Sequence, residues 1–412
     1  MDNHQGQTEL FAPEAAVWEP RYRMLDCWRG LACLMVVVHH AGDALAWAEA
    51  GGTGGTDWPK WLTVLVVRRM NLGVSLFFVI SGYCIAASAE ATGRKGGSPW
   101  AFIGRRFWRI YPPYWAALLG FLAIVVALDV SGHGRLVTGP LGVDLDPPRS
   151  LDWRQWLGNL TLTETWRPHF WGPERNVYTG VAWSLCFEEQ FYLICFLTLW
   201  LAPGRFYTAL GAATVAIVAA RVWCWQAGAL GSLRGTFPML WHEFAVGLAV
   251  FYRLNVARRP SQRRLIEVGL AALCLIGLTT HGRGTATAAG FGLVLIALRG
   301  RDRWADLAWL SPLRASGRRC YSIYLAHLPF VVVGNRWLFE LGMTGFWARA
   351  LVMVPVVSAA GVAAGWAFHA VVETRFLNPP ASPSVVRHPA RSHAGRWRTL
   401  AGSRTNSQTV AT

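Results

Sequence analysis

Ionisable side chains interrupt an apolar stretch near the N-terminus, which reads LDCWRGLACLMVVVHH and ends at His40. If the stretch is an α-helix, Arg29 and His40 lie within roughly 20° of one face and roughly 16 Å apart along its axis. A neutral imidazole can remove a proton near pH 7, and a guanidinium can hold an anion such as a phosphate. An ionisable side chain inside a membrane is costly unless it faces a partner or a wet cavity, so we interpret the pair as part of a site. The alternative is a structural histidine whose ring finds its hydrogen-bond partner on a neighbouring helix.

Three arginines, Arg105, Arg106 and Arg109, stand in the segment RRFWRIYPPY, where a third apolar stretch begins. Such a cluster by itself is typical of the cytoplasmic end of a spanning helix. Together with Arg29 it can also form a guanidinium cluster, because the planar fork of arginine binds phosphate groups bidentately. We therefore expect a phosphate-bearing donor from the cytosol.

Further polar residues enter the apolar segments one at a time. Two adjacent carboxylates follow Trp183 in the segment WSLCFEE. Because successive helical residues point about 100° apart, at most one of Glu188 and Glu189 can share a given cavity comfortably. Ser81 belongs to FFVISGY, whose Ser-Gly pair permits a close helix approach or a local break. His327 stands two residues before a proline that should bend its helix.

The composition identifies the class of protein. Hydrophobic residues make up 53% of the 412 residues and charged residues only 15%, which is too apolar for a soluble protein of this length. We predict an all-α, polytopic integral membrane protein with about ten transmembrane helices and no large soluble domain. The ten spans are expected near residues 25–47, 72–90, 111–130, 181–201, 206–226, 237–254, 265–281, 284–298, 320–339 and 346–371.

The distribution of positive charge predicts the topology. The net charge is +16, but the arginines follow the loops, so nucleic acid is not expected as a partner. The segments 253–264 and 299–319 hold five and six arginines, whereas 227–236 holds one and 340–346 holds none. Because positive residues concentrate in short cytoplasmic loops, we expect a multi-pass protein of the cell inner membrane with both termini in the cytoplasm.

The remaining segments set the domain organisation. We divide the chain into a cytoplasmic N-terminal segment at 1–20, a transmembrane domain at 21–377 and a basic, disordered cytoplasmic tail at 378–412. The 41–70 segment is expected to be a flexible outside loop. The loop at about 131–180 is rich in tryptophan, which can form either an interfacial aromatic belt or a sugar-binding surface, and we favour the belt.

The cysteines and the glycosylation motif add little chemistry. The eight cysteines lie singly in or beside apolar segments and never as CxxC. This pattern suggests neither a zinc site nor a disulfide framework, so we interpret them as packing residues and expect no metal. Asn159 begins an Asn-Leu-Thr sequon, which matters only in a host with a secretory pathway.

The order and spacing of the motifs are more specific than any single motif. The chain runs from LDxxRG through FFVISGY, RRxxRIxP and WSLxxExxFYL to YLxHxP. This series closely resembles the acyltransferase 3 family of membrane acyltransferases, from about residue 21 to residue 377. The family's Arg-then-ten-residues-then-His motif corresponds to Arg29 and His40, its Arg-x-x-Arg to Arg106 and Arg109, and its Trp-Ser-Leu-x-x-Glu to Trp183 and Glu188.

The resemblance implies a ten-span core that takes an acyl group, often acetyl, from cytoplasmic acyl-CoA and passes it to a hydroxyl, usually on a sugar. Acyl-CoA is then a co-substrate, with acetyl-CoA expected first, and no cofactor is bound permanently. Acceptors in the family include surface polysaccharides, lipopolysaccharide, lipo-oligosaccharide signals and macrolides. The expected partners are therefore acyl-CoA, a hydroxyl-bearing sugar or glycolipid, and membrane lipid.

Two departures from the family pattern limit what the resemblance implies. The last span ends in Val-Glu373-Thr-Arg, where the family commonly has Glu-x-Pro, so we assign Glu373 no role. We also find no fused extracytoplasmic hydrolase-like domain of the kind that many relatives carry after the last span. Its absence leaves the identity of the acceptor undetermined. The sequence also does not determine the acyl chain length or the oligomeric state.

The expected roles follow from these residues together. We expect His40 and Glu188 to be catalytic, with His40 as the general base. Arg29, Arg106 and Arg109 are expected to bind the donor, and Asp26, Ser81, Trp183 and His327 to support the site. The neighbouring His39 has no counterpart in the family motif. A second class of function is a proton-coupled transporter or flippase in which His40, Glu188 and His327 form a relay.

Overall fold

The computed structural model describes residues 22–45, 57–94, 96–138, 141, 144–280 and 282–377. The expected segment 1–20 and the expected tail 378–412 lie outside these residues. Every regular element in the described ranges is a helix, and no large soluble domain accompanies them. The prediction of an all-α, polytopic membrane protein is confirmed.

Ten long helices or helical runs coincide with the ten predicted ranges. They are α1 (Met24–Ala41), α4 (Gly73–Arg94), α5 (Pro99–Val130), α7 (Trp183–Leu201), α8 (Phe206–Gln226), α9 (Trp241–Asn255), α10 (Pro260–Thr279), α11 (Arg283–Leu298), α13 (Cys320–Glu340) and the run of α14 (Phe346–Ala348), a π-helical turn (Arg349–Met353) and α15 (Val354–Val371). Five helical stretches are long and apolar enough to cross a membrane: Trp58–Arg94, Pro99–Val130, Trp183–Leu201, Pro203–Gln226 and Phe346–Val371. The count of ten spans stays a prediction.

A helix stands in part of the 41–70 segment, where the sequence predicts a flexible loop. Helix α3 (Trp58–Arg69) is capped by Asp57, whose carboxylate accepts a hydrogen bond from the Lys60 backbone N–H at 3.5 Å. A 3₁₀ turn (Met70–Leu72) then leads directly into α4. The loop prediction is therefore wrong for residues 58–69, because a capped first turn with a proline at its start is enough to begin a helix there.

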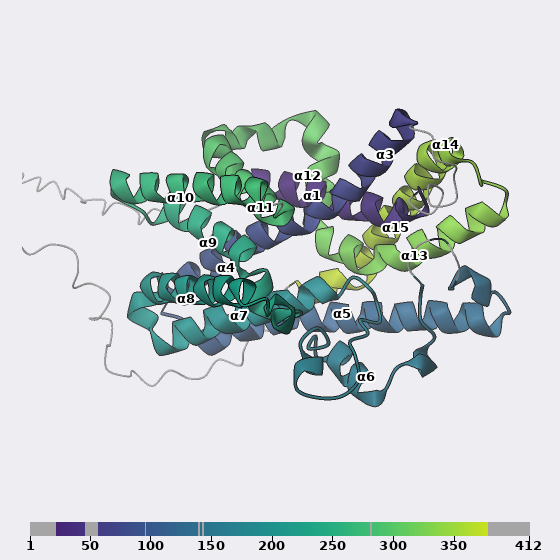
Figure 1. Cartoon of the computed structure of the whole chain (residues 1–412), viewed down its shortest axis with the longest axis horizontal. Coiled ribbons are helices and arrows are strands. Elements are labelled where there is room, and N and C mark those ends of the chain that lie inside the picture. The colour runs from purple at the N-terminus through teal and green to yellow at the C-terminus, as the bar shows by residue number, and fades with distance from the viewer. Residues whose placement is uncertain are drawn as a thin grey trace, which may run out of the picture.

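The tryptophan-rich loop folds back onto the middle of α5, and Figure 1 shows its helix α6 (Trp153–Leu160) lying against α5. Three aromatic donors of α5 bind the last backbone carbonyls of α6. Tyr111 donates to the carbonyl of Thr161 at 3.1 Å, Tyr114 to that of Asn159 at 2.8 Å and Trp115 to that of Leu160 at 2.9 Å. The last carbonyls of a helix lack the usual partner one turn further on, and the aromatic donors that bind them fix α6 to α5.

A buried ion pair holds the same loop together. Arg167 donates through Nε and Nη2 to the two carboxylate oxygens of Glu164, each at 2.8 Å, and Glu164 has no exposed surface. These hydrogen bonds raise the pKa of the Arg167 guanidinium. Asn159 is 1% exposed. Its side-chain NH₂ donates to the backbone carbonyls of Gln155 and Asn176, and its side-chain oxygen accepts from the Tyr178 backbone N–H. The sequon asparagine is therefore not open to glycosylation in the folded protein.

Helix α1 packs against α4, α12 (Ser311–Arg318), α13 and α15. Two glycines allow the close approach of α1 and α12. A Cβ on Gly317 would lie 1.6 Å from the Asp26 carbonyl oxygen, and a Cβ on Gly30 would lie 2.0 Å from the Leu313 carbonyl oxygen. The backbones are thus nearly in contact beside Arg29, which fixes the start of α1 in the bundle.

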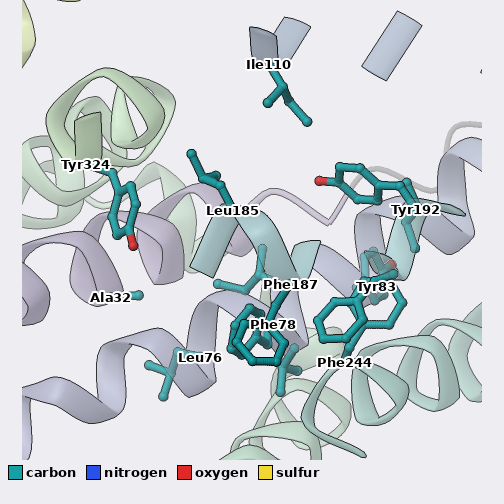
Figure 2. Packing of buried hydrophobic residues seen from close by; sticks show 14 of the residues in the cluster. Ala32, Leu76, Phe78, Tyr83, Ile110, Leu185, Phe187, Tyr192, Phe244 and Tyr324 are labelled. Atoms are coloured by element: carbon teal, nitrogen blue, oxygen red, sulfur yellow. The ribbon is translucent and has the colours of Figure 1, made fainter. Parts of the chain in front are cut away.

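Aromatic side chains fill the core between these helices. In Figure 2 the rings of Phe78, Phe187 and Phe244 occupy one part of the core, with Tyr324 and Tyr192 on either side. Edge-to-face contacts join this group, as between the rings of Phe78 and Phe191 at 5.6 Å. Such rings keep both α4 and α7 in place, and these helices carry Ser81 and Glu188.

The C-terminal end of α1, which carries His40, is held by two side chains from later helices. The Asn335 amide donates to the Ala41 carbonyl at 3.1 Å, and the Arg349 guanidinium donates to the Ala44 carbonyl at 3.1 Å. Both ends of α1 are thus fixed by contacts distant in sequence.

Candidate active site

A cavity of about 150 Å³ lies between α1, α4, α5, α7 and α13. Its polar lining consists of Arg29, Ser81, Arg106, Arg109, Ser184, Glu188, Tyr192, Tyr321 and Tyr324, and Cys84 and Cys320 also face it. Apolar side chains such as Val74, Phe77 and Ile80 complete its wall. Five of the residues singled out in the sequence therefore share one cavity: Arg29, Ser81, Arg106, Arg109 and Glu188.

Arg29 is held in place by its own helix and by α4. Its Nη1 lies 2.7 Å from the Asp26 carboxylate, one helical turn away, and its Nη2 lies 2.8 Å from the Cys84 sulfur. Asp26 therefore positions the guanidinium. The fork of an arginine carries five N–H donors, so these two contacts leave donors for an anion.

Arg106 and Arg109 lie three residues apart on α5 and so face the same side of that helix. Both line the cavity. The Arg106 guanidinium carbon lies 5.5 Å from the centre of the Tyr192 ring, a cation–π contact. Arg105 instead donates to the Thr92 hydroxyl at 2.7 Å and does not line the cavity. The helix thus separates the two motif arginines from their neighbour.

Glu188 faces Ser81 across the interface of α7 and α4. The Ser81 hydroxyl donates a hydrogen bond to the Glu188 carboxylate, and the Tyr192 hydroxyl lies 3.5 Å from the Ser81 oxygen. Glu189 does not line the cavity. This agrees with the expectation that at most one of the two adjacent carboxylates would face a shared cavity.

Trp183 packs beside the cavity and does not line it. Its ring makes edge-to-face contacts with Phe78 at 6.5 Å and Phe187 at 6.0 Å. The next residue, Ser184, lines the cavity and lies 2.6 Å from the Tyr324 hydroxyl, which donates to the Val181 carbonyl at 2.6 Å. Trp183 therefore supports the wall by packing.

Several polar or thiol-bearing cavity residues were not singled out in the sequence: Cys84, Ser184, Tyr192, Cys320, Tyr321 and Tyr324. Ser184 stands four residues before Glu188, one helical turn on the same face, and this spacing could have indicated it. Tyr324 stands three residues before His327 and could have been found in the same way. The position of Cys84 depends on how α1 approaches α4, and nothing in its own segment indicated that contact.

His40 lies outside the cavity, near the other end of α1 from Arg29. Its ring centre is 5.4 Å from that of His327 and 5.3 Å from that of His39, and its Nδ1 is 3.9 Å from the Asp43 carboxylate. The His327 ring in turn lies 6.1 Å from that of Tyr324, which lines the cavity. The two embedded histidines are thus neighbours, and they adjoin the cavity through Tyr324.

Comparison with known proteins identifies the family. The model of an acyltransferase domain family, Acyl_transf_3, matches residues 22–369. The chain belongs to the acyltransferase 3 family. A Komagataeibacter xylinus protein provisionally named the membrane-bound transacylase BcsY is 27% identical over 350 residues, which cover 82% of this chain and 80% of that protein. No solved structure matches the chain.

Membership of this family makes the protein a membrane acyltransferase. The transporter or flippase reading gains no support from these comparisons. Within the described ranges, no group of three or more His, Cys, Asp or Glu side chains is placed to hold a metal ion.

Proposed function

We propose that the protein transfers an acyl group, acetyl in the first instance, from cytoplasmic acyl-CoA to a hydroxyl of a sugar-containing acceptor. The observation that carries the proposal is the convergence of Arg29, Arg106 and Arg109 from two helices on one cavity. Three guanidiniums that face one cavity inside a membrane protein need anionic partners. The carboxylates of Asp26 and Glu188 offset two of these three charges, so the cavity keeps a positive charge that favours an anionic ligand.

Acyl-CoA fits this requirement because its phosphates match the planar fork of arginine. The apolar wall formed by Val74, Phe77 and Ile80 suits the rest of an extended donor. In the proposed topology, α1 and α5 leave the cytoplasm near Arg29 and Arg106. The arginine end of the cavity then faces the compartment that supplies acyl-CoA, in a protein of the inner membrane with both termini in the cytoplasm.

His40 is proposed as the general base. Its nitrogen takes the proton of the acceptor hydroxyl while the hydroxyl oxygen forms a bond with the thioester carbonyl carbon. The carbon–sulfur bond of the thioester then breaks, and the thiolate of CoA receives the proton from the imidazolium. Arg29 and His40 share one unbroken helix, so they are roughly 16 Å apart along its axis. An extended donor held by the arginines can reach past Tyr324 toward the histidines.

Glu188 is proposed to hold the acceptor. Its carboxylate already accepts from Ser81 and lines the cavity, and a second hydroxyl can donate to its remaining lone pairs. A sugar offers several such hydroxyls. Sugar-containing molecules are also the usual acceptors in the acyltransferase 3 family, which supports this choice of acceptor class.

The test is to measure CoA binding and acyl transfer by the purified protein in detergent, with radiolabelled acetyl-CoA and a panel of sugars. Arg106→Ala and Arg109→Ala should each weaken CoA binding at least tenfold, and Arg109→Lys should weaken it because lysine lacks the planar fork. Arg105→Ala is the matched control, since Arg105 lies outside the cavity. Unchanged CoA affinity in both alanine variants at the cavity would refute the donor assignment.

A further inference from the structure

The tautomer of His327 is set by its own helix. Its Nδ1 lies 2.9 Å from the Ile323 carbonyl oxygen and 2.9 Å from the Tyr324 carbonyl oxygen. A carbonyl oxygen can only accept a hydrogen bond, so Nδ1 must carry the hydrogen. A neutral imidazole has one N–H, and Nε2 is therefore a bare acceptor.

The Nε2 atom of His327 is buried, and it has no hydrogen-bond partner within the part of the chain that the structure describes. The whole side chain has no exposed surface. A buried acceptor without a donor costs free energy, so we expect a hydrogen-bond donor to reach this atom in the working enzyme. The Tyr324 hydroxyl cannot serve, because it already donates to the Val181 carbonyl.

His40 is placed to provide that donor. The two ring centres are 5.4 Å apart, and an imidazole nitrogen lies roughly 1.2 Å from its ring centre. Facing nitrogens can therefore approach to roughly 3 Å, the length of an N–H···N hydrogen bond. His40 also differs from His327 in exposure, since 21% of its side-chain surface is open. His40 can meet a substrate, whereas the fully buried His327 cannot.

We infer that His327 is a positioning residue, which accepts the N–H of His40 and so holds His40 in the tautomer whose other nitrogen is free to act as the base. The inference rests on the proposed role of His40. When His40 takes the hydroxyl proton it becomes an imidazolium, and its N–H to His327 then carries a positive charge that the acceptor stabilises. An oriented acceptor behind a catalytic histidine serves the same purpose in hydrolytic triads.

Two other groups compete for the N–H of His40. The Asp43 carboxylate lies 3.9 Å from its Nδ1, and the His39 ring centre lies 5.3 Å from its own. Asp43 is 31% exposed in its side chain, so water can solvate it without His40. His39 has a buried Nδ1 without a partner in the described ranges, but it points about 100° away from His40 on the same helix. The Nε2 of His327 has no other donor among the described residues, which favours its pairing with His40.

A pair of substitutions tests the inference. His327→Gln keeps an acceptor oxygen close to the position of Nε2, whereas His327→Phe keeps the ring shape and has no acceptor. We expect His327→Phe to lower kcat roughly 10²-fold or more with the KM for acyl-CoA unchanged, and His327→Gln to recover most of that loss. If the phenylalanine variant does not fold, His327→Asn replaces it, because asparagine can still donate to the helix carbonyls but is too short to reach His40.

A second readout does not depend on turnover. In protein labelled with ¹⁵N-histidine, the signals of His40 are those that disappear in His40→Ala, and their chemical shifts report the tautomer. We expect a single tautomer in the parent protein and in His327→Gln, and a mixture in His327→Phe. An unchanged His40 tautomer in His327→Phe, or equal losses of kcat in the glutamine and phenylalanine variants, would overturn the inference. Failure of the parent protein to transfer acyl groups would instead count against the proposed function.

Discussion

The Ser81 hydroxyl donates a hydrogen bond to the Glu188 carboxylate across the interface of α4 and α7. Two motifs that are more than a hundred residues apart in the chain thus meet at one wall of the cavity. The contact leaves the carboxylate on the cavity surface, where it can bind a further donor. Its partner Ser81 fixes the rotamer, and the guanidiniums of Arg29, Arg106 and Arg109 line the same cavity.

Removing the charge of Glu188 should impair acceptor binding and leave donor binding intact. We expect Glu188→Gln to lower kcat/KM for the acceptor roughly 10²-fold, because an amide is a weaker acceptor than a carboxylate. CoA affinity, measured by calorimetry, should stay within about twofold of the parent. Glu189→Gln is the matched control, since Glu189 does not line the cavity. Equal losses in the two variants would show that the cavity-facing position of Glu188 is irrelevant.

Removing the proposed base should slow the chemical step alone. We expect His40→Ala to lower the rate of transfer about 10²–10⁴-fold, with CoA affinity largely retained. His39→Ala is the matched control, and it should keep most of the activity because His39 points about 100° away on the same helix. Both variants are compared at equal yields of folded protein. Transfer by His40→Ala at the parental rate would contradict the assignment.

The cavity residues could be located from the sequence because short motifs fix local geometry. The spacing of Arg106 and Arg109 puts both on one face of a helix, and the adjacency of Glu188 and Glu189 separates them by about 100°. The structure places all three predicted arginines, Ser81 and Glu188 around the same cavity. Their functional roles stay predictions.

The parts that the sequence analysis missed depend on contacts distant in the chain. Helix α12, with eight residues, is too short to be stable alone and exists where Gly317 packs on Gly30 of α1. Helix α3 is an exception, because the cap at Asp57 that precedes it is a local signal. The pairing of His40 with His327 depends on how α1 meets α13, which neither segment encodes by itself.

The topology makes a prediction for intact cells. A cysteine placed at Gly300, in the arginine-rich segment 299–319, should not react with a membrane-impermeant maleimide added outside, because that segment is expected to be cytoplasmic. A cysteine placed at Gly342, in the turn expected outside, is the positive control and should react. Labelling of the parent protein gives the background from the native cysteines. Strong external labelling at position 300 would overturn the topology.

The glycine contact between α1 and α12 offers a test of how the arginine end of the cavity is held. A Cβ at position 317 would lie 1.6 Å from the Asp26 carbonyl oxygen, and a backbone atom can yield only if the two helices separate. We expect Gly317→Ala to destabilise the protein by about 3 kcal/mol, with a lower Tm in detergent. Because Asp26 positions Arg29, CoA affinity should fall as well.

The matched control is Gly269→Ala in α10, where a Cβ would meet no atom within 4 Å. Alanine has the higher helix propensity, so this variant should keep or slightly raise the Tm, by an amount corresponding to about 0.5–1 kcal/mol. Thermal unfolding and CoA binding are measured on both variants in the same detergent. If Gly317→Ala matches Gly269→Ala in both measurements, α1 and α12 do not make this contact in the folded protein, and Arg29 must be held in another way.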